Sequence, residues 1–292
     1  MRLMKIVYIL IFTSSLLAHE SGFENIKIRI ENVNKNIWCV FGAGGNIGIS
    51  VGEDGILMID DQFAPLAEKI QSALENKFHK KIKYIINTHW HGDHTGGNEA
   101  FSKIAPIIAQ QNVKTRLQNI QKRGSRVFPK RPKEAWPTIS YQKHLELEFN
   151  NEEVVLTHLP NGHTDGDSIV YFSKSKVLHM GDHFFTKRFP FIDIHTGGSV
   201  SGYLKNLSFV LKNFSKETKL IPGHGILSSM SDLEKYYQMI LNTNKMVQDK
   251  KRAKKSLELI IKEGLGDKFK SYAWGFISEK KWIEVLFVDK KD

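Results

Sequence analysis

The chain has 292 residues, of which 41% are hydrophobic and 25% are charged, and these fractions are ordinary for a globular protein that buries a full-sized core. Its single cysteine, Cys39, excludes an intramolecular disulfide. The formal net charge of +11 is compatible with nucleic acid, anionic lipid or an acidic small molecule as a partner, and it does not choose among them.

The first eighteen residues differ from the rest of the chain. Arg2 and Lys5 precede an almost wholly apolar run from Ile6 to Leu17, and Ala18 offers a small residue at a cleavage point. This layout is typical of a secretory signal peptide, and the run is short for a membrane span. We expect cleavage of this segment, a periplasmic or secreted protein, and no stable membrane insertion afterwards. An uncleaved anchor and a buried first strand are the alternatives.

Beyond this segment the pattern alternates between strands and helices. Short apolar runs bounded by Gly and Asn predict strands, and apolar residues at helical spacing predict helices. The expected strands lie at 26–30, 37–41, 47–51, 56–59, 82–87, 106–109, 145–149, 154–159, 169–172, 177–179 and 220–221. The expected helices lie at 64–78, 95–101, 112–121 and 200–211, and the final seventy residues look mainly helical.

The segment 124–137 interrupts this pattern. Gly124 and three prolines predict an irregular stretch, and its arginines and lysines make it basic. We expect either a lid, in which Arg126 or Lys130 meets a substrate carboxylate, or a plain surface excursion.

Two successive β-rich halves, each ending in helices, indicate the fold class. They predict two sheets packed face to face with helices outside, an α/β (α+β) four-layer αββα sandwich. After the signal peptide at 1–18, residues 19–292 are expected to form one such domain with a helical C-terminal region.

A dense group of metal-binding side chains follows one of the predicted strands. His89, His91, Asp93 and His94 fall within six residues, and imidazole nitrogens with a carboxylate oxygen form a typical zinc ligand set. His89 and His91 are two residues apart, so in an extended loop they point the same way and can hold one ion. Gly92 lets the chain turn sharply, so that Asp93 and His94 can face a second ion.

Four ligands do not fill the shells of two ions, so further ligands are expected downstream. His163, Asp182 and His224 each lie beside a glycine and just past the end of a predicted strand. Loops at strand ends are where α/β proteins place their sites. The sequence therefore predicts these three residues as the missing ligands.

This set of residues resembles the metallo-β-lactamase fold superfamily. The resemblance rests on the run His89-Trp90-His91-Gly92-Asp93-His94, followed in order by His163, Asp182 and His224, and it covers roughly residues 37–226. It implies the αββα sandwich and two ions, the first held by His89, His91 and His163, the second by Asp93, His94 and His224, with Asp182 bridging. Asp60 matches an early aspartate of the family, which would accept the other N–H of a metal-bound imidazole.

The resemblance also implies a mechanism. Two zinc ions, or alternatively iron or manganese, would share a water and lower its pKa, so that a metal-bridging hydroxide attacks a small carbonyl substrate. Asp93 is expected to orient this nucleophile, and His183 is expected to reach the substrate as a second catalytic residue. His195 is expected to border the site, and Trp90 to form a wall.

An aspartate at position 182 narrows the branch of the superfamily. One large class of β-lactamases carries cysteine there and another carries serine, whereas a bridging aspartate looks more like the thioesterase, lactonase and phosphodiesterase branches. We therefore expect an exported hydrolase whose substrate is a lactone, a thioester or a β-lactam amide. An anionic small molecule is one form that this substrate could take.

Two alternatives belong to other classes of protein. The first is a phosphodiesterase or nuclease of the same fold, which the basic charge favours. A signal peptide, however, removes the chain from cytoplasmic nucleic acid, so no nucleic-acid partner is expected. The second alternative is a non-hydrolytic iron redox or metal-binding protein, and metal content would separate it from a zinc hydrolase.

Overall fold

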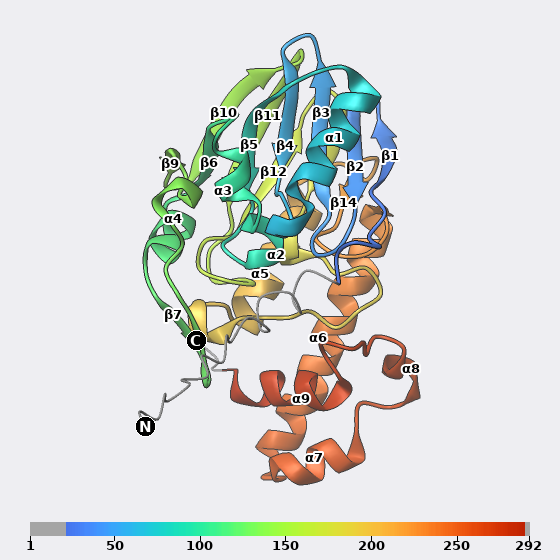
Figure 1. The fold of residues 1–292 in the computed structure, drawn as a ribbon. Coiled ribbons are helices and arrows are strands. Elements are labelled where there is room, and N and C mark those ends of the chain that lie inside the picture. The colour runs from blue at the N-terminus through green and yellow to red at the C-terminus, as the bar shows by residue number, and fades with distance from the viewer. Residues whose placement is uncertain (1–21, 290–292) are drawn as a thin grey trace, which may run out of the picture.

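The computed structural model describes residues 22–289, and the signal peptide predicted at 1–18 lies outside these described residues. Figure 1 shows two β-sheets lying against each other, with helices on their outer faces and the C-terminal helices gathered beyond one end of the sheets. Among residues 22–289, no helix has the length and apolar character needed to span a bilayer. The extent of the domain, 19–292, stays a prediction.

The described residues form two large sheets and a small hairpin. Within residues 22–289 the first sheet has seven strands in the order β1-β2-β3-β4-β5-β6-β9, and the second has six in the order β10-β11-β12-β13-β14-β15. The first sheet comprises β1 (Arg29–Asn34), β2 (Ile37–Phe41), β3 (Ile47–Gly52), β4 (Gly55–Ile59), β5 (Ile82–Asn87), β6 (Ile107–Gln110) and β9 (Ile139–Tyr141). The second comprises β10 (His144–Phe149), β11 (Glu152–His158), β12 (Ser168–Phe172), β13 (Val177–His179), β14 (Lys219–Ile221) and β15 (Ser228–Ser229). The hairpin pairs β7 (Gln121–Arg123) with β8 (Arg126–Phe128).

The helices divide into those beside the sheets and those of the C-terminal region. The α-helices are α1 (Ala67–Phe78), α2 (Gly92–Thr95), α3 (Asn98–Phe101), α4 (Gln111–Gln118), α5 (Val200–Asn213), α6 (Met230–Arg252), α7 (Leu257–Glu263), α8 (Asp267–Lys270) and α9 (Glu279–Val288). Short 3-10 turns are η1 (Ala64–Leu66), η2 (Lys133–Ala135), η3 (Gly181–His183) and η4 (Ile194–Thr196). The long helix α6 begins at a capping box, in which Ser229 and Asp232 satisfy each other's backbone N–H groups.

Strand β4 shows how one strand serves two layers of the fold. All five of its residues are buried, and successive side chains of a strand point to opposite faces. Leu57 and Ile59 pack between the two sheets, against residues such as Val154 of the second sheet. Ile56 and Met58 belong instead to the buried cluster that includes α1. The strand is therefore covered on both faces, as a continuous apolar run predicts.

Helices α5 and α6 cover the outer face of the second sheet. Leu178 and Leu220 of this sheet share a buried cluster with Leu207 of α5 and Ile240 of α6. The same cluster continues to Trp282 of α9, so the C-terminal helices are continuous with the core. With α1 outside the first sheet, the layers follow the order α-β-β-α, and the predicted sandwich is confirmed.

The segment 124–137 differs from its prediction. It was expected to lack regular structure, but β8 lies within it and pairs Val127 with Lys122 and Arg126 with Arg123. Gly124 has φ +59°, a conformation that closes a two-residue hairpin turn at little cost for glycine. The prolines forbid a regular element only after the hairpin, where η2 is a single turn.

The strand directions explain where a site can form. β4 and β5 are parallel, as are β13 and β14, so the loops after each pair open at one edge of their sheet. β11 runs in the same direction as β13, because both are antiparallel to β12. All the predicted ligands lie in the loops or short helical turns that directly follow β5, β11, β13 and β14.

Candidate metal centre

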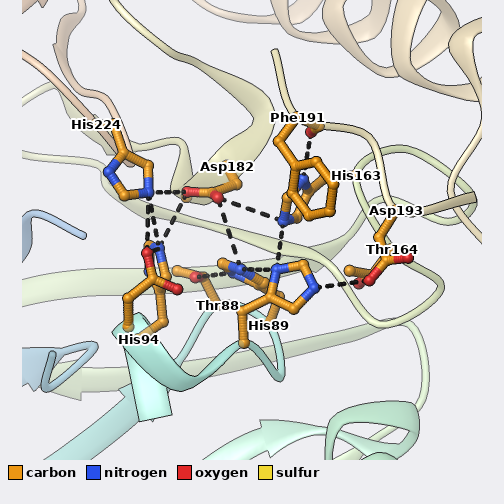
Figure 2. A network of polar contacts seen from close by, with 12 residues as sticks. Thr88, His89, His94, His163, Thr164, Asp182, Phe191, Asp193 and His224 are labelled. Atoms are coloured by element: carbon orange, nitrogen blue, oxygen red, sulfur yellow. Dashed lines mark hydrogen bonds and ion pairs between the residues drawn. The ribbon is translucent and has the colours of Figure 1, made fainter. Parts of the chain in front are cut away.

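Three histidines from two loops form the first ligand cluster. Nε2 of His89 lies 3.1 Å from Nδ1 of His91, and Nε2 of His163 lies 2.8 Å from the same Nδ1. Their ligand atoms and a carboxylate oxygen of Asp182 lie within 4.8 Å of one another, and Figure 2 shows His89 and His163 converging on Asp182. All four side chains are buried, so they are held in this arrangement.

The second cluster consists of Asp93, His94 and His224. Oδ2 of Asp93 lies 3.3 Å from Nε2 of His224 and 3.6 Å from Nε2 of His94. The two imidazole nitrogens are 3.4 Å apart. Asp93 and His94 lie in the short helix α2, next to the loop of the first cluster, and His224 comes from the loop after β14. The two clusters are therefore neighbours.

Asp182 joins the two clusters through its two carboxylate oxygens. Oδ2 lies 3.3 Å from Nε2 of His163 and 3.8 Å from Nε2 of His89, in the first cluster. Oδ1 lies 3.1 Å from Nε2 of His94 and 3.3 Å from Nε2 of His224, in the second. The carboxylate therefore has the position of a bridging ligand.

Asp60 holds the loop between β5 and α2 from behind. Its Oδ2 lies 2.7 Å from Nδ1 of His94, and its Oδ1 accepts a hydrogen bond of 2.7 Å from the backbone N–H of Thr88. The hydroxyl of Thr88 donates to Oδ2 of Asp60 and lies 3.1 Å from Nδ1 of His89. Because the Asp60 carboxylate accepts the Nδ1–H of His94, the ring is fixed in the tautomer that presents Nε2 to the second cluster, as the resemblance implied.

The other histidines of the first cluster are oriented in the same way by oxygens of one loop. Nδ1 of His163 donates to the backbone carbonyl of Phe191 at 2.7 Å. Nε2 of His91 lies 3.0 Å from Oδ2 of the buried Asp193. His91 therefore presents Nδ1 to the cluster, whereas His89 and His163 present Nε2.

The charges of the centre favour bound cations. Although burial alone raises the pKa of Asp182, His224 and the other surrounding histidines hold the pKa of this carboxyl well below its usual range. Burial alone would lower the pKa of His224, but Asp182 and Asp93 raise it to about 9. The carboxylates thus attract positive charge into a buried site, which is the electrostatic requirement for holding metal ions.

A metal also fits the hydrogen bonding and the space around Asp182. Buried polar atoms are normally hydrogen-bonded, yet among the described residues Oδ1 of Asp182 accepts no hydrogen bond of good geometry, although Nε2 of His94 lies 3.1 Å away. A Cβ at Gly223 would overlap this oxygen, and a Cβ at Gly45 would overlap the ring of His94. Glycines at these positions leave room for the ligands, and nitrogen and oxygen donors in this number suit zinc or a similar divalent ion.

Comparison with known proteins agrees with this geometry. The model of the metallo-beta-lactamase superfamily matches residues 46–224, which include every candidate ligand. The chain belongs to this superfamily. It is therefore a metal-dependent hydrolase, and the matched residues contain both ligand clusters.

The relatives within the superfamily are distant in sequence. The chain is 24% identical over 207 residues to a type 2 metallo-beta-lactamase of Bacillus cereus, covering 68% of this chain and 77% of that protein. A metallo-beta-lactamase from Pontibacter korlensis superposes with a TM-score of 0.62 at 16% identity, over 74% of this chain and all of that one. The sec-alkylsulfatase Pisa1 from Pseudomonas sp. superposes with a TM-score of 0.66 at 16% identity, over 89% of this chain and 50% of that one. At such identities the superpositions establish the fold alone.

A cavity of about 660 Å³ opens above the two clusters. His91, Asp93, Asp182 and His224 form part of its lining. Trp90 lines the cavity as well, in agreement with its expected place in the wall of the site. The volume lies within the range of about 300–1,000 Å³ that small-molecule sites occupy.

Two predicted site residues of this superfamily member lie away from the cavity. His183 is buried, stacks on Tyr203 with ring centroids 5.2 Å apart, and lies 3.0 Å from the side-chain nitrogen of Asn206. Burial lowers its pKa to about 3. It thus packs behind Asp182 without access to a substrate in the cavity. His195 is exposed and does not line the cavity, so it does not border the site as expected.

Sequence reasoning missed Asp193, which lies two residues before His195 in the same loop. A single aspartate in a loop carries no spacing signal. Its role becomes visible only when the fold brings it 3.0 Å from Nε2 of His91. The signal that could have found it is the need of every ligating imidazole for an acceptor on its other nitrogen.

Proposed function

We propose that the chain is an exported hydrolase that holds two zinc ions and cleaves a small carbonyl substrate: a lactone, a thioester or a β-lactam amide. One observation carries the proposal. The two oxygens of Asp182 face two separate clusters of nitrogen and oxygen donors, and a carboxylate so placed suits a pair of neighbouring ions. Zinc is favoured because imidazole and carboxylate are its common ligands, with iron or manganese as the alternatives.

The residues of each cluster would have distinct tasks. His89, His91 and His163 would hold one ion, while Asp93, His94 and His224 would hold the other, with Asp182 shared. When bound, two such ions supply a hydroxide nucleophile at neutral pH and polarise the substrate oxygen that it approaches. The protein's own part is to orient the donors and to exclude bulk water from the buried side of the centre.

Asp93 is the candidate catalytic residue that faces the cavity. Its side chain is 27% exposed, and although burial alone would raise its pKa, His94 and His224 hold that pKa well below the usual range. A carboxylate that stays ionised accepts a hydrogen bond from the attacking water and orients it. Asp93 is therefore suited to positioning the nucleophile rather than to storing a proton.

The bridging aspartate and the arginines of the cavity bear on the substrate. An aspartate at position 182 is more typical of the lactonase and thioesterase branches than of the β-lactamases, which carry cysteine or serine at the matching position. A second candidate function is hydrolysis of a phosphodiester or a sulfate ester, because Arg123, Arg126 and Arg188 line the cavity. The similarity in fold to a sec-alkylsulfatase makes a secondary alkyl sulfate a useful test compound.

The experiment combines metal analysis with a panel of substrates. The panel contains a chromogenic cephalosporin, a lactone, a thioester, a phosphodiester and a secondary alkyl sulfate. We expect about two zinc ions per chain, as a two-metal site requires, and turnover of a carbonyl compound. Asp182→Ala should lose both metal and turnover, whereas the matched surface variant His195→Ala should keep both. Iron in place of zinc, or a zinc-loaded protein that turns over no panel member, would refute the proposal.

Export has a test of its own. Cells that express the full chain are fractionated, and the N-terminus of the recovered protein is determined by mass spectrometry. Protein outside the cytoplasm that lacks residues 1–18 supports the proposed signal peptide. Protein retained in the cytoplasm with Arg2 and Lys5 still present contradicts it.

A further inference from the structure

The cavity above the metal centre has two kinds of side chain in its walls. The aromatic ones are Phe63, Trp90, Phe128, Phe185, Phe191, Trp274 and Phe276. The charged ones that do not belong to the ligand clusters are all arginines: Arg123, Arg126 and Arg188. Aromatic rings offer apolar contact area, and guanidinium groups bind carboxylates and other oxyanions.

The register of the β7–β8 hairpin explains why its arginines face the cavity. Arg123 pairs with Arg126 and Gln121 with Phe128, whereas Lys122 pairs with Val127. Because side chains alternate between the faces of a strand, the first two pairs lie on one face of the hairpin and the third on the other. Arg123, Arg126 and Phe128 line the cavity, and the residues of the third pair do not.

The two arginines of the hairpin have different surroundings. The guanidinium of Arg123 lies 5.0 Å from the ring centroids of both Phe128 and Phe191, and 3.7 Å from Oδ2 of Asp193. Within residues 22–289, Arg126 forms no ion pair, and it is exposed. Arg123 therefore anchors the hairpin over the centre, while Arg126 is free to bind a ligand. Like charges directly opposite each other destabilise a hairpin, and an anion beside them would relieve that repulsion.

Part of the lining comes from the C-terminal region, beyond the part of the chain that matches the superfamily: Trp274 and Phe276. Trp274 donates from Nε1 to the backbone carbonyl of Phe189 at 3.0 Å, which fixes its ring beside the cavity. The guanidinium of Arg188 lies 4.9 Å from the centroid of this ring. Phe276, which is 40% exposed, packs edge-on against Phe191 with centroids 5.2 Å apart. The lining of the cavity therefore combines fixed aromatic rings with Arg126, an arginine that forms no ion pair within residues 22–289.

We propose that the cavity selects substrates that join an aromatic or extended apolar group to an oxyanion, with Arg126 binding the oxyanion and Phe276 contacting the apolar group. This inference rests on the proposed function, since it names the substrate class of the same site. It goes further in assigning selectivity to two segments, the β7–β8 hairpin and the loop before α9, neither of which contributes a candidate metal ligand.

The experiment measures binding to the zinc-loaded protein by calorimetry, so that it does not depend on turnover. The probes are naphthaleneacetate, its neutral analogue naphthaleneacetamide, and naphthalenesulfonate, which separates carboxylate from sulfonate recognition. Arg126→Ala should weaken both anions about tenfold, as expected for loss of one charge-assisted contact, and leave the amide unchanged. Lys122→Ala is the matched control, because it removes the same charge from the other face of the hairpin. Equal losses in the two variants, or equal affinity of acid and amide for the unmodified protein, would overturn the proposal.

The aromatic half of the proposal has a separate pair of variants. Phe276→Ala should weaken all three probes about three- to tenfold, the range for loss of an aromatic contact. Phe209→Ala is the matched control, since Phe209 is also 40% exposed but lies in α5, outside the cavity lining. Unchanged binding in Phe276→Ala would overturn the role of the aromatic wall.

Kinetics then separate this inference from the proposed function. With an anionic substrate of the panel, Arg126→Ala should raise KM about tenfold with little change in kcat, because binding to a remote group is lost equally from ground and transition states. A fall in kcat at unchanged KM would contradict the inference. Selective binding of the anionic probes in a protein silent on the whole panel would uphold the inference and refute the hydrolytic function.

Discussion

Replacing Asp193 tests whether the loop that follows Phe191 controls the metal centre. Asp193→Ala removes the acceptor that lies 3.0 Å from Nε2 of His91, so the ring is no longer held with Nδ1 toward the first cluster. A hydrogen bond to a charged group is worth about 1.5–3 kcal/mol. That corresponds to a loss of about ten- to hundredfold in metal affinity, the range found for the partners of ligating histidines.

The assay is zinc competition with a chromogenic chelator, which resolves a tight and a weak site. We expect Asp193→Ala to weaken the ion held with His91 and to leave the other ion closer to wild type. The side chain also accepts from the backbone N–H of His195, so Asp193→Asn, which keeps an acceptor there, controls for loss of that cap. Arg123→Ala removes the neighbouring ion pair and leaves the hydrogen bond to His91 in place. Wild-type affinity at both sites in a folded Asp193→Ala protein would refute the reasoning.

Three further outcomes are expected. Gly45→Ala should displace the ring of His94, which a Cβ would overlap, and lower zinc content to about one ion per chain; two ions by metal analysis would contradict this. Burial raises the pKa of Asp167 from 3.8 to about 7, so the folded state holds a proton that the unfolded state has released, and stability is lost as pH rises from about 4 through 7. In Asp167→Asn the side chain stays neutral, so the free energy of unfolding of this variant, measured by denaturant titration, should rise by up to about 4 kcal/mol relative to that of wild type over this pH range. If the free energies of unfolding of the two proteins change in parallel with pH, Asp167 does not have this role. Removing metal with a chelator should lower Tm by at least about 5 °C, because bound ions stabilise only the folded state; an unchanged Tm in a protein shown to be metal-free would exclude this coupling.

Much of the fold could be predicted because the core strands are short apolar runs between turn residues. The strands at 37–41, 82–87 and 177–179 have the predicted bounds. Where glycines interrupt a pattern the bounds were less certain: the helix expected at 95–101 is divided into α2 and α3 around Gly96 and Gly97. The first strand begins at Arg29 rather than at residue 26, because its apolar residues extend beyond the part that pairs with β2.

The ligand set could be predicted because each member follows a strand, and the fold brings those strand ends to one place. The residues that support or surround the ligands carry no such signal. Asp193 and Trp274 reach the centre through loops whose course depends on tertiary packing. His183 and Asp182 are adjacent in sequence, but Asp182 contacts the histidines of both clusters whereas His183 stacks on Tyr203. Adjacency to a ligand therefore did not predict access to the cavity.

The origin of the cavity walls separates what the protein binds from how it reacts. The candidate ligands end at His224, whereas Trp274 and Phe276 belong to a segment fixed to the body through Phe189. Exchanging residues 273–277, or redesigning the tip of the β7–β8 hairpin, would alter the shape and charge of the entrance while the donors to the ions keep their supports. An engineer, or a lineage under selection, could therefore change the preferred compound through these two short stretches without rebuilding the reactive centre.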